Sequence, residues 1–426
     1  MRPGETAGVM LHPVEILAAS LMVAKWAGET VLSALNRREI RRHAGALPPA
    51  LAGVMDATTY AKAVDYSLAR NAFTRLEDGF GLLLLAAVVF SGVLPWSHSA
   101  WSALAGAGHW SEAAWLVLVG VALALPGLPL DWWSTFRLEA RFGFNKSSPA
   151  LWLADKLKGG AVAVVLGFPI LWLVLALVGW TGRWWWVWGG ASVLVFQLLM
   201  LVLYPKLILP LFNTLTPLPE GELRTALLAL AERAGFRART IEVMDGSKRS
   251  GHSNAFFTGF GRFRRIVLFD TLIAQLDAEE LGAVLAHEIG HYKCGHVPKL
   301  LAVSAGFTVA GFGVIAWLAL SPGFLAGFGF GPAAGVAPAL LLFALLGGLA
   351  TFWLSPLLNG LSRRHEYEAD AFARAAVGSA APLVGALRKL SEKNLTNLTP
   401  HPWYSTFHYS HPTLLERERA LTAPQG

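Results

Sequence analysis

The chain has a single cysteine among its 426 residues, and only 15% of its residues are charged. One cysteine excludes an intrachain disulfide and a zinc site built from cysteines alone. Soluble globular domains carry about 25% charged residues, so the apolar share of this chain, 54%, requires surroundings other than an ordinary core. The net charge of +7 is not gathered into a compact run of Lys and Arg, which argues against nucleic acid as a partner.

The N-terminal segment also lacks the features of a cleavable signal peptide. Its apolar run is interrupted by Glu15 and Lys25, and no small-residue cleavage site follows a short apolar core. We therefore expect this segment to belong to the mature protein. The sequence contains no internal repeat either.

Long apolar runs account for the composition. A bilayer core of about 30 Å is crossed by roughly 20 apolar residues in a helix. Glu15, Lys25 and Glu29 fall in the first such run, and a charge at the centre of a span costs about 2.5–3.5 kcal/mol, so we expect these side chains to face a polar interior or to lie near a helix end. The seven predicted spans are about 8–33, 80–96, 110–133, 159–180, 184–209, 297–320 and 332–358.

The connections between these spans alternate in their content of Lys and Arg. Seven such residues lie in 34–79 and four in 134–157, whereas 97–109 and 321–331 have none. Short connections rich in Lys and Arg stay on the cytoplasmic side. The alternation therefore predicts an integral, multi-pass protein with its N-terminus outside and its C-terminus in the cytoplasm.

Two long polar segments then share the cytoplasmic side, and together they are large enough for one compact unit. The first contains a predicted helix near 219–235, a strand in TIEVMD, and a hairpin formed by SNAFFTGF and RRIVLFD. The predicted division of the chain is 1–209 for the first five membrane helices, 210–296 for the hairpin and the helix after it, 297–358 for the last two membrane helices, and 359–426 for the C-terminal segment.

The stretch LAHEIGHYK places two imidazoles and a carboxylate close together. Asp277 is a predicted N-cap for a helix through this stretch, with a glutamate three residues later as in a capping box. On this helix His287 and His291 lie one turn apart on the same face, and such a pair can bind one Zn²⁺. Glu288 can then act as general base toward a metal-bound water. The alternative is two helical histidines that occur there by chance or as caps.

A catalytic zinc needs a third protein ligand and an open position. In LSRRHEYEADAFARAA, Glu366 and Asp370 lie four residues apart on one face of a predicted helix. We predict that Glu366 is the third ligand and that Asp370 accepts the N–H of a ligand histidine. Cys294 is a further candidate ligand. The alternative is a charged surface helix whose arginines pair its acids, and His365 and Glu368 are assigned to that role.

These motifs resemble those of the type I CAAX prenyl protease family, zinc-dependent integral membrane metallopeptidases of the gluzincin type. The similar stretches, in family order, are FNTLTPLPEGEL, EVMDGSKRSGHSNAFFTGFGRFRRIVLFDTLI, LAHEIGH, LSRRHEYEADAFA and WYSTFHYSHPTLLERERAL. With the seven spans, the expected fold is an all-α polytopic membrane protein with a small α+β zincin-like metalloprotease unit on the cytoplasmic side. The resemblance implies that the spans enclose a large water-containing chamber.

The resemblance also implies roles that the residues alone do not give. His411, in HYSHPTLLER, matches the family's transition-state histidine and Arg417 its arginine partner, while Asn254 matches a residue on the strand that binds extended substrate. From the residues alone, a His-Pro followed by a cation can stabilise a developing oxyanion, and His401 and His408 remain competing candidates for that role.

We therefore expect a metalloendopeptidase that hydrolyses peptide bonds with one Zn²⁺ per chain, with Glu288 as base and then proton donor. Its substrate is a peptide or protein, lipidated or membrane-embedded; family members remove the last three residues of a prenylated C-terminal Cys-a-a-X sequence. The Ala, Gly, Leu and Trp bias and the final TAPQG predict a bacterial inner membrane. A misfolded or surplus membrane protein is then the alternative substrate.

An alternative of a different class is a channel or transporter with a metal-binding site. Glu15, Lys25 and Glu29 within the first apolar run suit a pathway through the membrane. That alternative explains neither the glutamate beside the first histidine of the motif nor the Glu366 and Asp370 pair.

Overall fold

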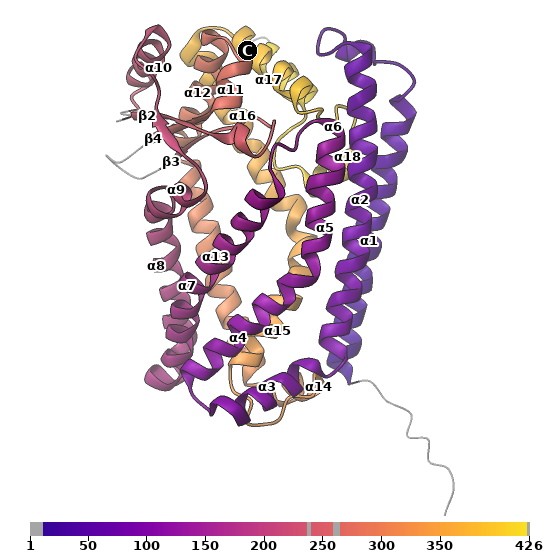
Figure 1. Ribbon diagram of the computed structural model, residues 1–426, viewed down its shortest axis with the longest axis vertical. Helices are drawn as coiled ribbons and strands as arrows, with labels where there is room; N and C mark the ends of the chain where they lie inside the picture. Colours follow the sequence, from indigo (N-terminus) through magenta and orange to yellow (C-terminus); the bar gives the residue numbers. More distant parts are fainter. Residues whose placement is uncertain (1–11, 237–239, 259–264, 424–426) are drawn as a thin grey trace, which may run out of the picture.

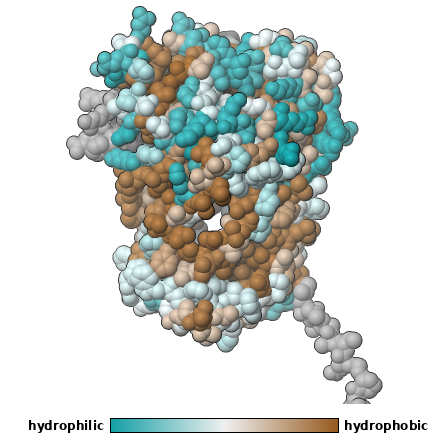
Figure 2. Space-filling model, viewed as in Figure 1, coloured by the Kyte–Doolittle hydropathy of each residue, from teal (hydrophilic) through white to brown (hydrophobic). Residues whose placement is uncertain are grey.

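The computed structural model describes residues 12–236, 240–258 and 265–423. Long helices make up most of the molecule, and a small sheet with shorter helices covers one end of them (Figure 1). On the face in view, Figure 2 shows an apolar band across the long helices, with an opening in that band, and polar side chains gathered over the end that carries the sheet. This division between an apolar band and a polar end is what the hydropathy of the sequence predicts.

Five stretches of the described chain are long and apolar enough to cross a membrane, or six if α2 (Ala57–Phe90) and α3 (Val93–Ala105), bent by 53°, form one span. The longest stretch, Pro149–Phe212, contains two helices, α7 (Pro149–Thr181) and α8 (Trp185–Leu203), which pack against each other. The other stretches are α1 (Pro13–His43), His109–Phe142 with α4 (His109–Ala124), α5 (Leu128–Trp133) and α6 (Ala140–Phe142), α13 (His296–Ala319), and Ala337–Val377 with α15 (Ala337–Thr351) and α16 (Ser355–Val377).

The first two helices differ from their predicted bounds. Residues 8–11 of the first predicted span lie outside the described residues, and α1 continues to His43. The predicted span 80–96 crosses the break between α2 and α3, and α2 already begins at Ala57, where the Asp56 carboxylate accepts the backbone N–H groups of Thr58 and Thr59 at 2.7 and 2.9 Å. Helical caps therefore set these ends, and the apolar run marks only the part of each helix that suits a bilayer.

The charges in the first apolar run have polar partners, as predicted. Glu15 closes a capping box at the start of α1. Farther along, Lys25 lies 3.7 Å from Glu29, and Glu29 lies 3.3 Å from His408 of α18 (Pro402–His408). Lys25 and Glu29 line a pocket of 270 Å³, so they face the interior of the helical bundle.

A four-stranded sheet in the order β1-β2-β4-β3 lies at the polar end. The predicted strand in TIEVMD is β2 (Thr240–Met244), which runs parallel to β4 (Arg265–Phe269), and the predicted hairpin is β3 (Ala255–Thr258) antiparallel to β4; its turn lies outside the described residues. The short β1 (Leu215–Pro217) was not predicted, because three residues show no alternation. The order of the strands leaves β3 at an edge.

The two long polar segments share one apolar core at this end. Leu227 of α10 (Glu222–Arg233) and Leu285 of α12 (Ala278–Lys293) are buried together with Ala373 of α16 and Leu421 of α19 (Leu414–Thr422). The remaining α-helices of the described residues are α9 (Leu209–Phe212), α11 (Asp270–Gln275), α14 (Pro322–Gly327) and α17 (Ala381–Lys393). Burial of apolar side chains from both segments thus holds α12 and α16, which carry the motifs, side by side.

Candidate active site

Helix α12 begins at the capping box that the sequence predicts. The Asp277 carboxylate accepts the backbone N–H of Glu280, and the Glu280 carboxylate accepts that of Asp277, both at 3.0 Å. Near the other end of α12, Gly290 allows this helix to approach α16 closely, because a Cβ at Gly290 would lie 3.0 Å from the Cα and the carbonyl oxygen of Ala369. The glycine within HEIGH therefore lets the histidine face of α12 meet the acidic face of α16.

The three predicted metal ligands converge where these helices meet. His287 Nε2 lies 3.1 Å from His291 Nε2, and Glu366 Oε1 lies 3.2 Å from His291 Nε2. The ligand atoms of the three residues all lie within 4.8 Å of one another. Glu366 Oε2 is buried without a hydrogen-bond partner. This oxygen lies 3.5 Å from His287 Nε2 and 3.7 Å from Arg417 Nη1, without a hydrogen bond to either. Two imidazole nitrogens and a buried carboxylate this close together fit a bound cation.

Asp370 supports the first of the two histidines, as the sequence predicts. Its Oδ1 lies 2.8 Å from His287 Nδ1, and its Oδ2 accepts a hydrogen bond from Arg417 Nε at 2.8 Å. Arg417 is 8% exposed, so this ion pair is buried. Burial alone lowers the pKa of His287, but hydrogen bonds to Asp370 and Glu366 outweigh it and raise that pKa to about 9.

Of the three histidines that could stabilise an oxyanion, only His411 lies at this site. Its Nε2 is 3.3 Å from Glu366 Oε1, and its Nδ1 is 2.9 Å from the hydroxyl of Ser410. The His411 side chain is 64% exposed, yet the protein around its ring desolvates it enough to lower its pKa, which favours the neutral imidazole. His408 instead contacts Glu29, and His401 caps α18 by accepting the backbone N–H of Trp403. The structure thus separates candidates that the residues alone left equal.

Glu288 follows the first predicted ligand, His287, on α12. Burial raises the pKa of Glu288 above that of an ordinary glutamate, because a low-dielectric site disfavours the charged carboxylate. Asn254 lies directly before β3, is exposed, and fixes the start of that strand by accepting the N–H of Ala255 at 2.8 Å. Strand β3 also contacts α12, so a free sheet edge lies beside the helix that carries the histidines.

Comparisons with known proteins agree with this arrangement. Residues 36–214 match the family model described as CAAX prenyl protease N-terminal, five membrane helices, and residues 217–425 match Peptidase family M48. The chain is 35% identical over 408 residues to CAAX prenyl protease 1 homolog of Oryza sativa subsp. japonica, covering 94% of this chain and 95% of the relative. The chain belongs to the CAAX prenyl protease 1 family.

Further matches extend over almost the whole chain. CAAX prenyl protease 1 of Saccharomyces cerevisiae is 34% identical over 441 residues, covering 96% of this chain and 95% of the relative. The crystal structure of S. mikatae Ste24p superposes with a TM-score of 0.91 at 33% identity, over 96% of this chain and 99% of that chain. The protein is therefore an integral, multi-pass membrane metalloprotease of the CAAX prenyl protease type.

Two residues of this family member that contact the site were not predicted to do so. His296, on the helix after α12, is 2% exposed, and its Nδ1 lies 2.9 Å from His291 Nδ1. Glu368, which the sequence assigned to a surface role, lies 3.0 Å from His296 Nε2. Between the two helices Gly295 has φ 69°, a left-handed conformation that suits glycine. No helical spacing could relate His296 to His291, because the helix breaks between them.

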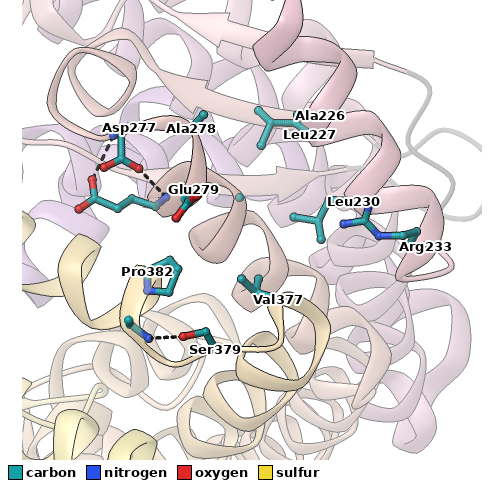
Figure 3. Close-up of a pocket in the computed structure, with 13 residues that line it drawn as sticks. Ala226, Leu227, Leu230, Arg233, Asp277, Ala278, Glu279, Val377, Ser379 and Pro382 are labelled. Atoms are coloured by element: carbon teal, nitrogen blue, oxygen red, sulfur yellow. Dashed lines mark hydrogen bonds between the residues drawn. The ribbon is translucent and has the colours of Figure 1, made fainter.

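A pocket of 570 Å³ lies away from the metal site. It lies between α10, the start of α12 and the start of α17, with Arg233, Glu279 and Pro382 among its lining residues (Figure 3). Asp277, at its edge, is ten residues before His287, which corresponds to about 15 Å along a helix. None of the three predicted metal ligands lines this pocket.

Proposed function

We propose that this protease binds one Zn²⁺ per chain through His287, His291 and Glu366 and is an endopeptidase. The observation that carries the proposal is the approach of three ligand atoms around a buried carboxylate oxygen that lacks a hydrogen bond. Catalytic zinc sites use three protein ligands of these types and keep one further position open. When bound, the ion supplies a Lewis acid that polarises a water molecule and the scissile carbonyl.

Glu288 is the general base and then the proton donor. It takes a proton from the attacking water and passes it to the amine that leaves. Burial raises its pKa, and a raised pKa brings a carboxyl group closer to the operating pH, where one group serves both proton transfers.

Asp370 and Arg417 hold His287 in place. The carboxylate accepts the Nδ1–H of His287, which leaves Nε2 free to bind the ion. Arg417 acts through Asp370, since its guanidinium donates to that carboxylate and is buried there. Its Nη1 also lies 3.7 Å from Glu366 Oε2, so Arg417 adds positive charge beside the metal ligands as the catalytic partner of His411.

His411 stabilises the oxyanion that develops on the scissile carbonyl. As a neutral imidazole that accepts the Ser410 hydroxyl at Nδ1, it carries its proton at Nε2, the atom beside Glu366. Donors aimed at the position where charge develops typically contribute a factor of 10²–10³ to the rate.

Substrate binds in extended form along β3. This strand is at the sheet edge, so its outer backbone groups can pair with a peptide by β-augmentation. Asn254 marks the start of the edge and fixes its first backbone group. A peptide held there lies along the neighbouring helix α12, which presents both ligand histidines.

The substrate is a prenylated C-terminal Cys-a-a-X sequence, from which the protein removes the last three residues. The names of the relatives from rice and yeast support this class. We further propose that the chain crosses the membrane seven times, with its N-terminus outside and the site on the cytoplasmic side, which the alternation of Lys and Arg between the apolar runs supports. The spans enclose a water-containing chamber, and the opening in the apolar band supports such a space. In a bacterial inner membrane, misfolded membrane proteins are the alternative substrates of the same chemistry.

The test is cleavage of a labelled, prenylated CaaX peptide by the purified protein, compared with the same peptide lacking the prenyl group. We expect release of the tripeptide from the prenylated peptide, a rate about 10²–10⁴-fold lower for Glu288→Gln, and the same zinc content in both proteins. Equal rates for the two proteins would remove the assignment of Glu288. Cleavage of unfolded membrane proteins but not of either peptide would replace the substrate class.

A further inference from the structure

The second ligand histidine, His291, has a support of its own that differs from that of His287. We propose that His296 and Glu368 are positioning residues, which fix the ring and the tautomer of His291 for metal binding. The inference rests on the proposed function, because it takes His287, His291 and Glu366 as the metal ligands.

An unbroken line of close polar contacts starts at His291. Its Nε2 faces Glu366 Oε1 at 3.2 Å, and its Nδ1 faces His296 Nδ1 at 2.9 Å. On the far side of the second imidazole, His296 Nε2 lies 3.0 Å from Glu368 Oε2. The other carboxylate oxygen accepts a hydrogen bond from Arg364 Nε at 3.0 Å.

The positions of the protons follow from this line. A ring nitrogen that binds a metal carries no proton, so a neutral His291 holding an ion at Nε2 has its proton at Nδ1. That Nδ1–H must donate to His296 Nδ1, which therefore has no proton. His296 then carries its own proton at Nε2 and donates it to the Glu368 carboxylate. Each donor meets one acceptor, and the line has a single direction, from the metal ligand to the carboxylate.

The surroundings hold His296 in the orientation that the line needs. Its ring is 2% exposed and stacks on His365, with ring centres 4.1 Å apart and planes inclined by 14°. Glu368 is held in turn by Arg364 and by Lys299, whose Nζ lies 3.7 Å from Oε2. His365, which the sequence assigned to the surface, is also buried.

The same residues could be interpreted as a second metal site, since Cys294, His296 and Glu368 also place ligand atoms within 4.8 Å of one another. Binding an ion at His296 Nε2 would move its proton to Nδ1. Two N–H groups, of His291 and His296, would then face each other at 2.9 Å, and neither would have an acceptor. Two cations, Arg364 and Lys299, also already neutralise the carboxylate. The geometry therefore favours the hydrogen-bonded line.

The test measures zinc affinity by competition with a chelating indicator, on the full-length protein in detergent. Loss of a residue that orients a ligand typically weakens metal binding 10–100-fold, and we expect this for His296→Ala. We expect the same direction for Glu368→Leu, whereas Glu368→Gln keeps an oxygen that accepts the His296 N–H and stays within about threefold of the unaltered protein. Cys294→Ser is the matched control, with one zinc per chain and unchanged affinity.

Two further readouts separate positioning from folding. The metal-free His296→Ala protein should still unfold cooperatively, only a few degrees below the unaltered metal-free protein, and its Co²⁺ form should show a changed absorption spectrum, because the geometry at His291 has loosened. Unchanged affinity and spectrum in His296→Ala, or equal losses for Glu368→Gln and Glu368→Leu, would overturn the proposal. So would two zinc ions per chain that fall to one in Cys294→Ser. An unaltered chain that binds no zinc would overturn the proposed function as well.

Discussion

His287 and His291 lie one turn apart on α12, yet the protein supports the two rings by different means. Behind His287 stands a buried carboxylate, Asp370, which is held by the buried Arg417. His291 instead contacts a second histidine, His296, which in turn contacts the Glu368 carboxylate, whose side chain is 32% exposed. We call Asp370 and Arg417 the enclosed support, because this ion pair is buried. We call His296 and Glu368 the exposed support, because its carboxylate is partly exposed.

Because of this difference, substitutions in the two supports should lower the stability of the protein by different amounts. Removing one partner of a buried ion pair leaves the other charge without compensation, which is costly. Removing the neutral ring behind His291 leaves one N–H group without an acceptor, which costs less. The two proposed ligands can thus be weakened to different degrees without altering either histidine.

The largest effect is expected on the enclosed support. Asp370→Ala leaves Arg417 buried without its partner, and we expect a loss of about 3–5 kcal/mol of stability together with loss of zinc. Thermal unfolding and metal content measure both. The double variant Asp370→Leu, Arg417→Met is the control and should regain most of the stability but not the zinc affinity. A fully stable Asp370→Ala protein would contradict the asymmetry between the two supports.

A third histidine near Glu366 sharpens the comparison, because it should serve the reaction and not the metal. In His411→Ala we expect a rate about 10²–10³-fold lower with unchanged zinc affinity, measured with the prenylated peptide and by metal titration. His408→Ala is the matched control, since that ring contacts Glu29 instead. A loss of zinc from His411→Ala would make His411 a ligand and would require a new account of the site.

The enclosed support should also give zinc binding a marked pH dependence. The hydrogen bonds to Asp370 and Glu366 raise the pKa of His287 to about 9, and the ion must displace that proton. Apparent zinc affinity should therefore fall as the pH falls below about 9, by roughly tenfold per pH unit for this one proton. In Asp370→Asn the zinc affinity should begin to fall at a lower pH, because an uncharged amide does not stabilise the protonated His287 ring as a carboxylate does. Metal titrations between pH 6 and pH 9 test this, and an affinity that does not vary with pH would contradict it.

The smallest effect is expected at the outer end of the exposed support. Arg364 pairs with Glu368, but its own side chain is 79% exposed, and exposed ion pairs contribute about 0–1 kcal/mol. Zinc affinity of Arg364→Ala should stay within threefold of the unaltered protein. A loss as large as that expected for His296→Ala would mean that the charge on Glu368, and not its hydrogen bond to His296, sustains His291.

Much of this site could be predicted because its chemistry follows helical spacing. His287, His291, Glu366 and Asp370 occur in two pairs, each four residues apart, and helical periodicity alone places each pair on one face. The capping box at Asp277, the strand in TIEVMD and the two strands of the hairpin were likewise local features. Each of these predictions depended only on residues within one element.

Features that depend on a break or on a distant partner could not be predicted. Gly295 interrupts the helix between His291 and His296, so no periodicity relates the two rings. Glu368 lies off the face of α16 that Glu366 occupies, and His296, at the start of α13, contacts it there. The choice among His401, His408 and His411 likewise depended on how α18 packs, and the resemblance to a family supplied it where the residues did not.

The central claim is that His287, His291 and Glu366 bind one metal ion while Glu288 does not. Zinc content per chain, measured on purified Glu366→Ala and Glu288→Gln beside the unaltered protein, tests it most directly. We predict one zinc in the unaltered protein and in Glu288→Gln, and close to none in Glu366→Ala. One zinc retained in Glu366→Ala, or lost in Glu288→Gln, would contradict this assignment of the ligands.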